Sequence, residues 1–318
     1  MSSAPASAPP ASNPEAPAAR PTRARARFSV PGNLGRAVLS NRKAMAGATL
    51  LAIFVVMALV PGLIAPGAPG AELYPPGQGA SFAHPLGTTS YGQDIFTQFI
   101  WGARASLIIA VVAGLLSTLL SALIGVSAGY LPGATDGILS LITDVFLIIP
   151  AFPLVVVIAA YSKGGGNATI IAVLVVTGWA YGARQLRAQV LSLRNRDFLV
   201  AAKLRGERTL RIIVSEILPN MTSLLVANFL GASVYAILTA AGLQFVGLGN
   251  VNTDSWGTML YWAQNNEALQ AGLPLWAVAP GLGIALLGGA FALLNYAFDE
   301  ISNPALRPVR GRGARSDS

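Results

Sequence analysis

Long apolar runs, separated by short breaks rich in glycine, proline or polar residues, dominate the chain. Five of these runs are full-length candidates for membrane helices, and a sixth keeps the same length despite four polar side chains. A helix needs about 20 mostly apolar residues to cross the hydrocarbon layer. None of the runs alternates with the period of two residues that marks a barrel strand. The six predicted transmembrane helices are 44–66, 105–130, 138–161, 168–186, 219–242 and 276–298.

The composition agrees with a membrane protein. Hydrophobic residues make up 53% and charged residues 11% of the chain, whereas about a quarter of a soluble domain is charged. The chain has no cysteine, which excludes disulfides, thiol catalysis and cysteine-bound metals. Its one histidine, His84, does not make a metal site alone. No phosphate-binding G-x-x-x-x-G-K-[ST] motif occurs, so any ATP that drives the protein is bound by another subunit.

The positive charges predict the orientation in the membrane. Of 21 lysines and arginines, 19 precede the first span, follow the sixth, or lie between the fourth and fifth. Membrane proteins keep such charges in the cytoplasm. We therefore expect an all-α integral membrane protein with six transmembrane helices and both termini cytoplasmic. Lipid then accounts for this charge pattern, and nucleic acid is not an expected partner.

These boundaries predict the organisation of the whole chain. An interfacial helix is expected within 84–103, because its aromatic side chains favour the headgroup level of the outer surface. Another short helix, around Trp256, is expected to lie on or dip into the membrane after the fifth span. The expected parts are a disordered basic cytoplasmic tail (1–43), the first transmembrane helix (44–66), an extracytoplasmic segment with the interfacial helix (67–104), a core of five transmembrane helices (105–300) with a cytoplasmic loop (187–218), and a basic cytoplasmic tail (301–318).

Polar groups and prolines mark special positions within the spans. Pro150 and Pro153 predict a kink in the third span, because proline removes a backbone hydrogen bond. Polar side chains in a membrane are costly and often functional, but hydrogen bonding between helices explains them as well. Both interpretations stay open for Asn228, Gln244, Asn295 and Asp299.

The cytoplasmic loop is unusually basic and amphipathic. Residues 184–211 hold eight of the 21 lysines and arginines. Asp197 is expected to cap a helix whose apolar side chains group on one face, Gly206 to break it, and Thr209 to start a second helix. By charge alone, a solvated loop without a partner is an equally good interpretation.

The loop resembles the EAA loop of permease subunits in ABC importers. The segment DFLVAAKLRGERTLRIIVSEILPN carries the family's paired alanines, its glycine and its Leu-Pro ending. Val200 stands where the family usually has glutamate, and Glu216 where histidine is frequent. In that family a short coupling helix of this loop docks on an ATPase subunit. The coupling residues expected here are Asp197, Phe198, Ala201, Ala202, Leu204, Arg205, Gly206, Glu216 and Pro219.

Other segments narrow the resemblance to the second permease of dipeptide, oligopeptide and nickel importers. HPLGTTSYGQDIF, the following GARASL and GLQFVGLGNVNTDSWGTML are similar to motifs of that group, and LLNYAFDEISNPALR matches its ending more loosely. Thr89 and Gln93 replace the usual aspartate and arginine, and Asn303 replaces an aspartate. The resemblance covers about residues 84–307 in the correct order.

The resemblance implies the fold of a type I ABC importer permease and a non-catalytic role in the bacterial cell membrane. It implies as partners a paralogous permease, two ABC ATPase subunits that bind ATP and magnesium, and an extracytoplasmic substrate-binding protein. It implies no cofactor in this chain. Oligopeptides or dipeptides are the expected substrates, with oligosaccharides or nickel as alternatives. An ion-coupled secondary transporter or a membrane enzyme is less favoured, because the spans carry almost no charges and no catalytic cluster.

Overall fold

The computed structural model describes residues 41–162 and 166–302, so almost all of both predicted tails lies outside it. Helices make up the bundle, and no strand occurs within these two ranges. The elements are α2 (Arg42–Leu59), α3 (Pro61–Ile64), α4 (Ile95–Tyr130), α5 (Ala134–Ile148), α6 (Ala151–Tyr161), α7 (Asn167–Leu193), α8 (Asp197–Leu204), α9 (Thr209–Ile212), the π-helix η1 (Ile213–Ile217), α10 (Leu218–Asn220), α11 (Thr222–Phe245), α12 (Trp256–Asn265) and α13 (Pro274–Ser302).

Five of the six expected membrane spans are present as single helices, and the expected third span is a broken pair. Helices α2, α4, α7, α11 and α13 are each long and apolar enough to cross a membrane, and α5 with α6 makes a sixth span if the pair is counted as one. The two halves of that pair meet at 90°. Pro150 stands at the break, and because it has no N–H, the carbonyl of Phe146 loses its helical partner. Pro150 and Pro153 predict a kink in the third span, and the structure shows a 90° change of direction there.

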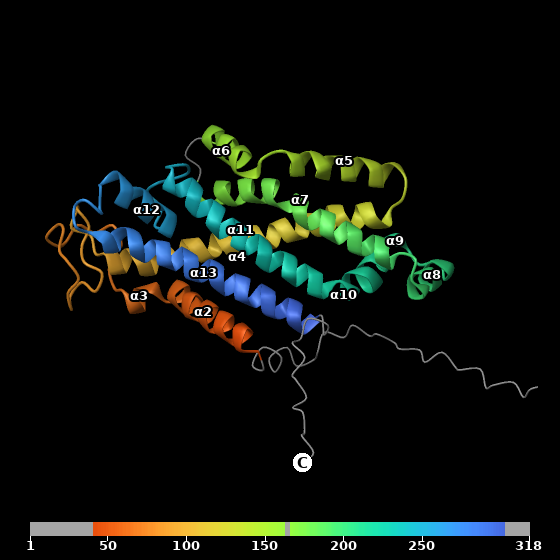
Figure 1. Cartoon of the computed structure of the whole chain (residues 1–318), viewed down its shortest axis with the longest axis horizontal. Coiled ribbons are helices and arrows are strands. Elements are labelled where there is room, and N and C mark those ends of the chain that lie inside the picture. The colour runs from red at the N-terminus through yellow and green to blue at the C-terminus, as the bar shows by residue number, and fades with distance from the viewer. Residues whose placement is uncertain (1–40, 163–165, 303–318) are drawn as a thin grey trace, which may run out of the picture.

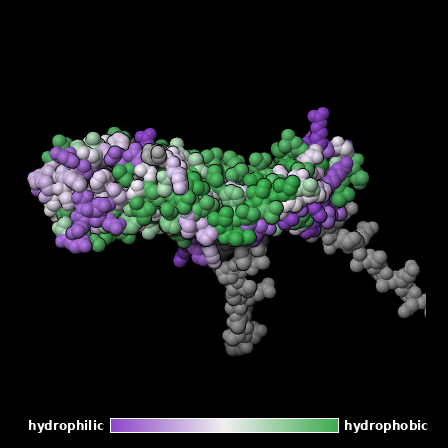
Figure 2. Space-filling view, turned by 90° about the horizontal axis from the view of Figure 1, so that it is seen from above, coloured by the Kyte–Doolittle hydropathy of each residue, from purple (hydrophilic) through white to green (hydrophobic). Residues whose placement is uncertain are grey.

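The long helices run side by side in an elongated bundle (Figure 1). Helix α12 and the segment before α4 lie at one end, here called the α12 end, and α8 lies at the other, the α8 end. The start of α2 and the end of α13 both lie toward the α8 end, as an even number of crossings requires. Figure 2 shows hydrophobic residues along the middle of the bundle and hydrophilic residues gathered toward its two ends. This band matches the surface that a bilayer covers.

The interfacial helix expected at 84–103 does not exist as a separate element. Helix α4 runs unbroken for 36 residues from Ile95, with Asp94 as its cap. The Asp94 carboxylate accepts hydrogen bonds from the backbone N–H and the hydroxyl of Thr97, at 2.9 and 2.6 Å. Ile95 and Ile100 are buried in the protein core. The prediction of a separate helix was wrong because the helix that begins at Ile95 continues through the core; its place relative to the membrane surface stays a prediction.

Helix α12 is the short helix expected around Trp256, and several of its residues are buried in the core. Its placement on or in the membrane stays a prediction. Trp256 is fully buried, and its indole N–H donates to the carbonyl of Phe99 at 2.9 Å. Ser255 and Thr258 form a reciprocal capping box at the start of the helix, which fixes its entry angle. The Trp256 ring also stacks on the Phe99 ring, with their centroids 5.4 Å apart. It meets the Phe54 ring edge-on, with their centroids 5.3 Å apart. These contacts tie α2, α4 and α12 together.

Close contact between α4 and α7 forms the centre of the bundle. A Cβ atom added at Gly125 of α4 would clash with the backbone carbonyl of Ala183 in α7. Small residues allow such close approach of membrane helices, where packing instead of the hydrophobic effect drives association. Gly125 thus sets the spacing of the helix that leads to the basic loop.

Candidate coupling surface and transport cavity

Helix α8 is the short amphipathic helix that the sequence predicts in the basic loop. Arg196 occupies the N-cap position and no side chain caps the helix, so the prediction that Asp197 caps it was wrong. Asp197 is the first helical residue, where its negative charge favours the positive end of the helix dipole. The loop itself is shorter than expected, because α7 continues through 187–193 as regular helix.

The end of α8 confirms the break expected at Gly206. The N–H groups of Gly206 and Glu207 bond back to the carbonyls of Lys203 and Ala202, at 2.9 and 3.3 Å. Gly206 has φ +72°, a left-handed conformation that costs other residues about 1–2 kcal/mol. This pair of bonds is a Schellman ending, which satisfies carbonyls that the helix leaves free. The chain therefore turns sharply into α9.

The apolar side chains of α8 are divided between two faces, whereas the sequence analysis placed them on one. Leu199 and Ala202 are completely buried, in a cluster that includes Tyr130 of α4 and Leu186 and Val190 of α7. This side anchors α8 to the bundle. The expected single apolar face was wrong because the loop has to pack on its own protein as well as on any partner.

The other face of α8 is apolar and exposed. Leu204 is 83% exposed and Phe198 37%, and Ala201 beside them is exposed too. Leu210 and Val214 extend the exposed apolar surface beyond α8. We call these five residues the knuckle. It lies at the α8 end of the bundle, and an apolar protrusion outside the bilayer is typical of a protein contact site.

The polar residues expected around the knuckle differ in their surroundings. Arg205 donates two hydrogen bonds to the Glu207 carboxylate, at 2.9 and 2.7 Å; being exposed, this pair contributes little to stability. Lys203 instead lies over the ring of Tyr130, 5.0 Å from its centroid. Lys203 therefore belongs to the anchoring side.

Glu216 and Pro219 lie in a feature that the sequence analysis missed. Between α9 and α10 the chain widens into the π-helix η1, where the N–H of Leu218 bonds to the carbonyl of Ile213. Pro219 offers no N–H to the carbonyl of Ser215, so the regular ladder is interrupted there. The carbonyl of Glu216 accepts a hydrogen bond from the Asn220 side chain at 2.6 Å. The sequence signal for this π-helix was Pro219, which has no N–H to donate to the carbonyl of Ser215 four residues earlier.

A cavity of about 610 Å³ lies beside the break between α5 and α6. Segments of α4, α7, α11 and α13 complete its wall. Among the described residues, no aspartate, glutamate, lysine, arginine or histidine lines it, but the amides of Gln185, Asn228 and Asn295 do, together with the hydroxyl-bearing Tyr235. An irregular backbone at membrane depth is tolerated where it lines such a cavity.

Several of the polar residues in the spans point to this cavity instead of to a bond between helices. Asn228 donates to the carbonyl of Leu224 in its own helix, at 3.2 Å. Within the described ranges, the Tyr235 hydroxyl and the Asn295 Oδ1 are buried without a hydrogen-bond partner. Gln244 is different, because its Oε1 accepts from Ser255 at 2.9 Å near α12. The side chain of Asp299 lies outside the described part of the structure.

Two ion pairs connect the cavity wall with the helix that carries α8. Arg187 of α7 makes two parallel hydrogen bonds with Asp136 of α5, at 2.7 and 3.1 Å. Arg184 pairs with Asp144 one turn further along. Leu186, the neighbour of Arg187, is buried in the cluster that anchors α8. A continuous set of contacts therefore runs from α8 through α7 to α5 and the break.

Comparison with known proteins decides the family. A family model described as "binding-protein-dependent transport system inner membrane component" matches residues 121–308, which include α7, the knuckle and α11 to α13. The chain belongs to this family. It is thus a multi-pass bacterial membrane protein and a permease of the ABC importer type.

Three relatives align with most of this chain and over most of their own length. The dipeptide transport system permease protein DppC of Bacillus subtilis is 34% identical over 277 residues, covering 86% of this chain and 85% of the relative. The oligopeptide permease OppC of Mycobacterium tuberculosis H37Rv is 32% identical over 287 residues, covering 88% and 96%. The di/tripeptide permease DppC of Pseudomonas aeruginosa is 33% identical over 276 residues, covering 84% and 89%.

Proposed function

We propose that this permease forms half of the transport path of an ATP-driven importer and is moved by an ATPase subunit that grips the knuckle. The observation that carries this proposal is the division of α8 into a buried anchoring side and an exposed apolar side. A solvated loop without a partner gains nothing from exposing the apolar side chains of Leu204 and Phe198 to water. The proposal also places the α8 end in the cytoplasm, which agrees with the positive-inside distribution.

The remaining partners follow from the type of importer. A second, paralogous permease completes the path, two ABC ATPase subunits bind ATP and magnesium, and an extracytoplasmic protein delivers the substrate. This chain contributes no catalytic group and no cofactor site to the reaction. Its task is mechanical: it holds the path and changes its shape when the ATPases close.

We infer that the substrates are peptides. The relatives reported above are named for dipeptides, tripeptides or oligopeptides. The cavity supports this, because its amide and hydroxyl groups suit the main chain that all peptides share, and its lack of charge does not select among side chains. Nickel is disfavoured, since no histidine or carboxylate lines the cavity and such ligands hold this metal.

The contacts from α8 to the cavity supply the mechanism. When the ATPases close, α8 moves with them and pulls on α7 through Leu199 and Leu186. The pair Arg187–Asp136 passes the displacement to α5. Because α5 and α6 are joined only at the sharp break, they can change their angle without unravelling a continuous helix. The cavity beside the break then opens to one side or the other.

Breaking the Arg187–Asp136 pair is expected to lower transport per ATP hydrolysed. In Arg187→Asp or Asp136→Arg we expect uptake to fall severalfold while the ATPases stay bound, because the knuckle is untouched. The combined charge swap should restore uptake. The matched comparison is Arg184→Asp, which should lower uptake less because the pair of Arg184 with Asp144 is more exposed. Equal losses in the Arg184 and Arg187 variants would remove the pair from the mechanism.

Reconstitution tests the proposed function as a whole. The permease, its paralogue, the two ATPases and the binding protein are placed in liposomes, and uptake of a labelled tripeptide is followed. We expect uptake only with ATP inside and all components present. Uptake by this chain alone, driven by an ion gradient, would show a secondary carrier instead.

A further inference from the structure

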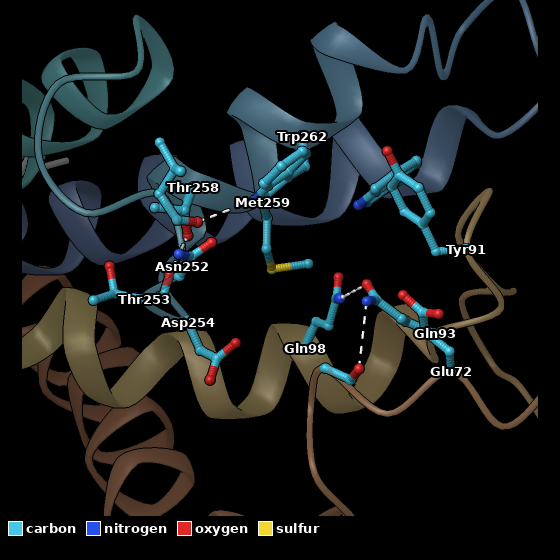
Figure 3. A pocket seen from close by; sticks show the side chains of 13 residues that line it. Glu72, Tyr91, Gln93, Gln98, Asn252, Thr253, Asp254, Thr258, Met259 and Trp262 are labelled. Carbon is cyan, nitrogen blue, oxygen red and sulfur yellow. Dashed lines mark hydrogen bonds between the residues drawn. The ribbon is translucent and has the colours of Figure 1, made fainter.

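A second cavity, of about 410 Å³, opens at the α12 end of the bundle, far from the knuckle (Figure 3). Its wall comes from the segment before α4, the first turn of α4, the loop before α12, and α12 itself. In Figure 3, Asp254 and Glu72 lie toward opposite ends of the cavity, with the side chains of Gln93 and Gln98 between them. The cavity is of the size that holds a small ligand or one end of a longer one.

The charges of this cavity are all of one sign. Glu72 and Asp254 both line it, and no lysine, arginine or histidine within residues 41–162 and 166–298 does. Neither carboxylate has a hydrogen bond or ion pair with the described residues. Burial raises the pKa of the Asp254 carboxyl, as expected for an acid that is partly withdrawn from water without a cation beside it. The segments 67–103 and 243–275 contain no lysine or arginine, and Arg104, which follows the first of them in α4, does not line the cavity.

One tryptophan in the wall of this cavity has a buried hydrogen-bond donor without a partner. Trp276 lines it and is only 1% exposed, and its buried Nε1 has no hydrogen-bond partner in the described part of the chain. The two other tryptophans nearby are satisfied: Trp262 donates to the carbonyl of Val251 at 3.0 Å, and Trp256 to that of Phe99. An unmade bond of a buried donor costs about 1–3 kcal/mol. A ligand that brings an acceptor atom would recover that cost.

Aromatic rings in the cavity wall add a further preference for a positively charged ligand. Tyr91, Trp262 and Trp276 all line the cavity, and the face of an aromatic ring attracts a cation. A divalent metal fits poorly, because no group of three or more metal-ligating side chains occurs within the described residues. A neutral sugar would leave both carboxylates without a countercharge. An organic ammonium with a carbonyl oxygen next to it uses the acids, the rings and the free indole N–H together.

We propose that this cavity binds the free amino terminus of the incoming peptide, with Asp254 binding the ammonium group, Glu72 adding negative charge at the other end of the cavity and Trp276 donating to the first carbonyl oxygen. The assignment of the ligand to a peptide rests on the proposed function; the preference for an ammonium rests on the cavity alone. At the end of the bundle opposite the knuckle, the site receives substrate before it enters the transport path.

Binding to the full-length chain in lipid nanodiscs tests this directly. The probe is L-alanyl-L-alanine amide, which carries an ammonium and no carboxylate, and the readouts are calorimetry and quenching of tryptophan fluorescence. We expect saturable binding of this probe and none of its N-acetyl form, which keeps every carbonyl but loses the charge. Equal binding of both forms would overturn the proposal.

Substitutions of single residues test which side chains of the cavity bind the ligand. Asp254→Asn is expected to weaken binding about tenfold or more, and Glu72→Gln to weaken it less. The matched control is Glu267→Gln, an exposed acid of the same end that does not line the cavity, and it should bind as the parent does. Trp276→Phe keeps an aromatic ring but removes the indole N–H; it should weaken binding of the dipeptide amide and leave ethylamine, which has no carbonyl, unaffected. Unchanged binding in Asp254→Asn would contradict the site.

The outcome is separable from that of the proposed function, because the binding measurement needs no ATPase. If the chain proves to retain no ATPase, the importer fails while amine binding can still hold. If both probe forms bind alike, the site fails while the importer stands.

Discussion

Replacing Leu204 with aspartate is expected to detach the ATPase subunits from the importer while the permease itself still folds. Leu204 is the most exposed apolar side chain of α8, so the change removes no internal packing. Burying a leucine in an interface contributes about 1.5–3 kcal/mol, and a charge in its place adds a desolvation cost. We expect retention of ATPase on the tagged chain to fall at least tenfold, about 1.4 kcal/mol, and uptake to fall with it.

The control for this variant lies at the other end of the bundle. Leu73 is 75% exposed and sits in the segment before α4, so Leu73→Asp makes the same chemical change away from the knuckle. Its ATPase retention should equal that of the parent chain. Normal retention in Leu204→Asp, with both variants equally well inserted, would show that the ATPase binds elsewhere.

The second large effect is expected at Ala202, and it has a different cause. Ala202 is fully buried among residues of α4 and α7. An aspartate there is an uncompensated buried charge, which costs several kcal/mol. Ala202→Asp should therefore release α8 from the bundle and lower the thermal stability of the isolated permease in detergent, before any question of partner binding arises.

The neighbouring alanine provides the matched control. Ala201 is exposed on the knuckle, so Ala201→Asp should leave the melting temperature of the isolated chain unchanged and impair only ATPase retention. The two variants differ by one position and carry the same charge. If both lowered stability equally, the division of α8 into an anchoring and an exposed side would be wrong.

The membrane class, the six spans and the presence of α8 were predictable because each depends on local pattern. Apolar length fixes a span wherever it occurs, and Gly206 marks a helix ending by its own backbone preference. The division of α8 into two faces was not predictable in this way. Leu199 and Ala202 are buried by Leu186 and Val190, and no local rule shows that those residues fold back onto the loop.

The errors elsewhere have the same origin. Residues 95–103 look suited to a membrane surface, but Ile95, Ile100 and Ala103 are buried against other helices, and α4 continues through the segment. Pro150 predicts a kink, yet the 90° bend depends on how α6 fits against α7 and α11. Neither cavity was visible in the sequence, because each is lined by segments that lie more than a hundred residues apart.

The most direct measurement is a cross-link from the tip of the knuckle. The chain contains no cysteine, so Leu204→Cys supplies its only thiol, and a maleimide that carries a photoreactive group can be attached there alone. In the assembled importer, illumination should join this position to an ATPase subunit, and a Leu73→Cys control should yield no such product. A product at Leu73→Cys and none at Leu204→Cys would contradict the account.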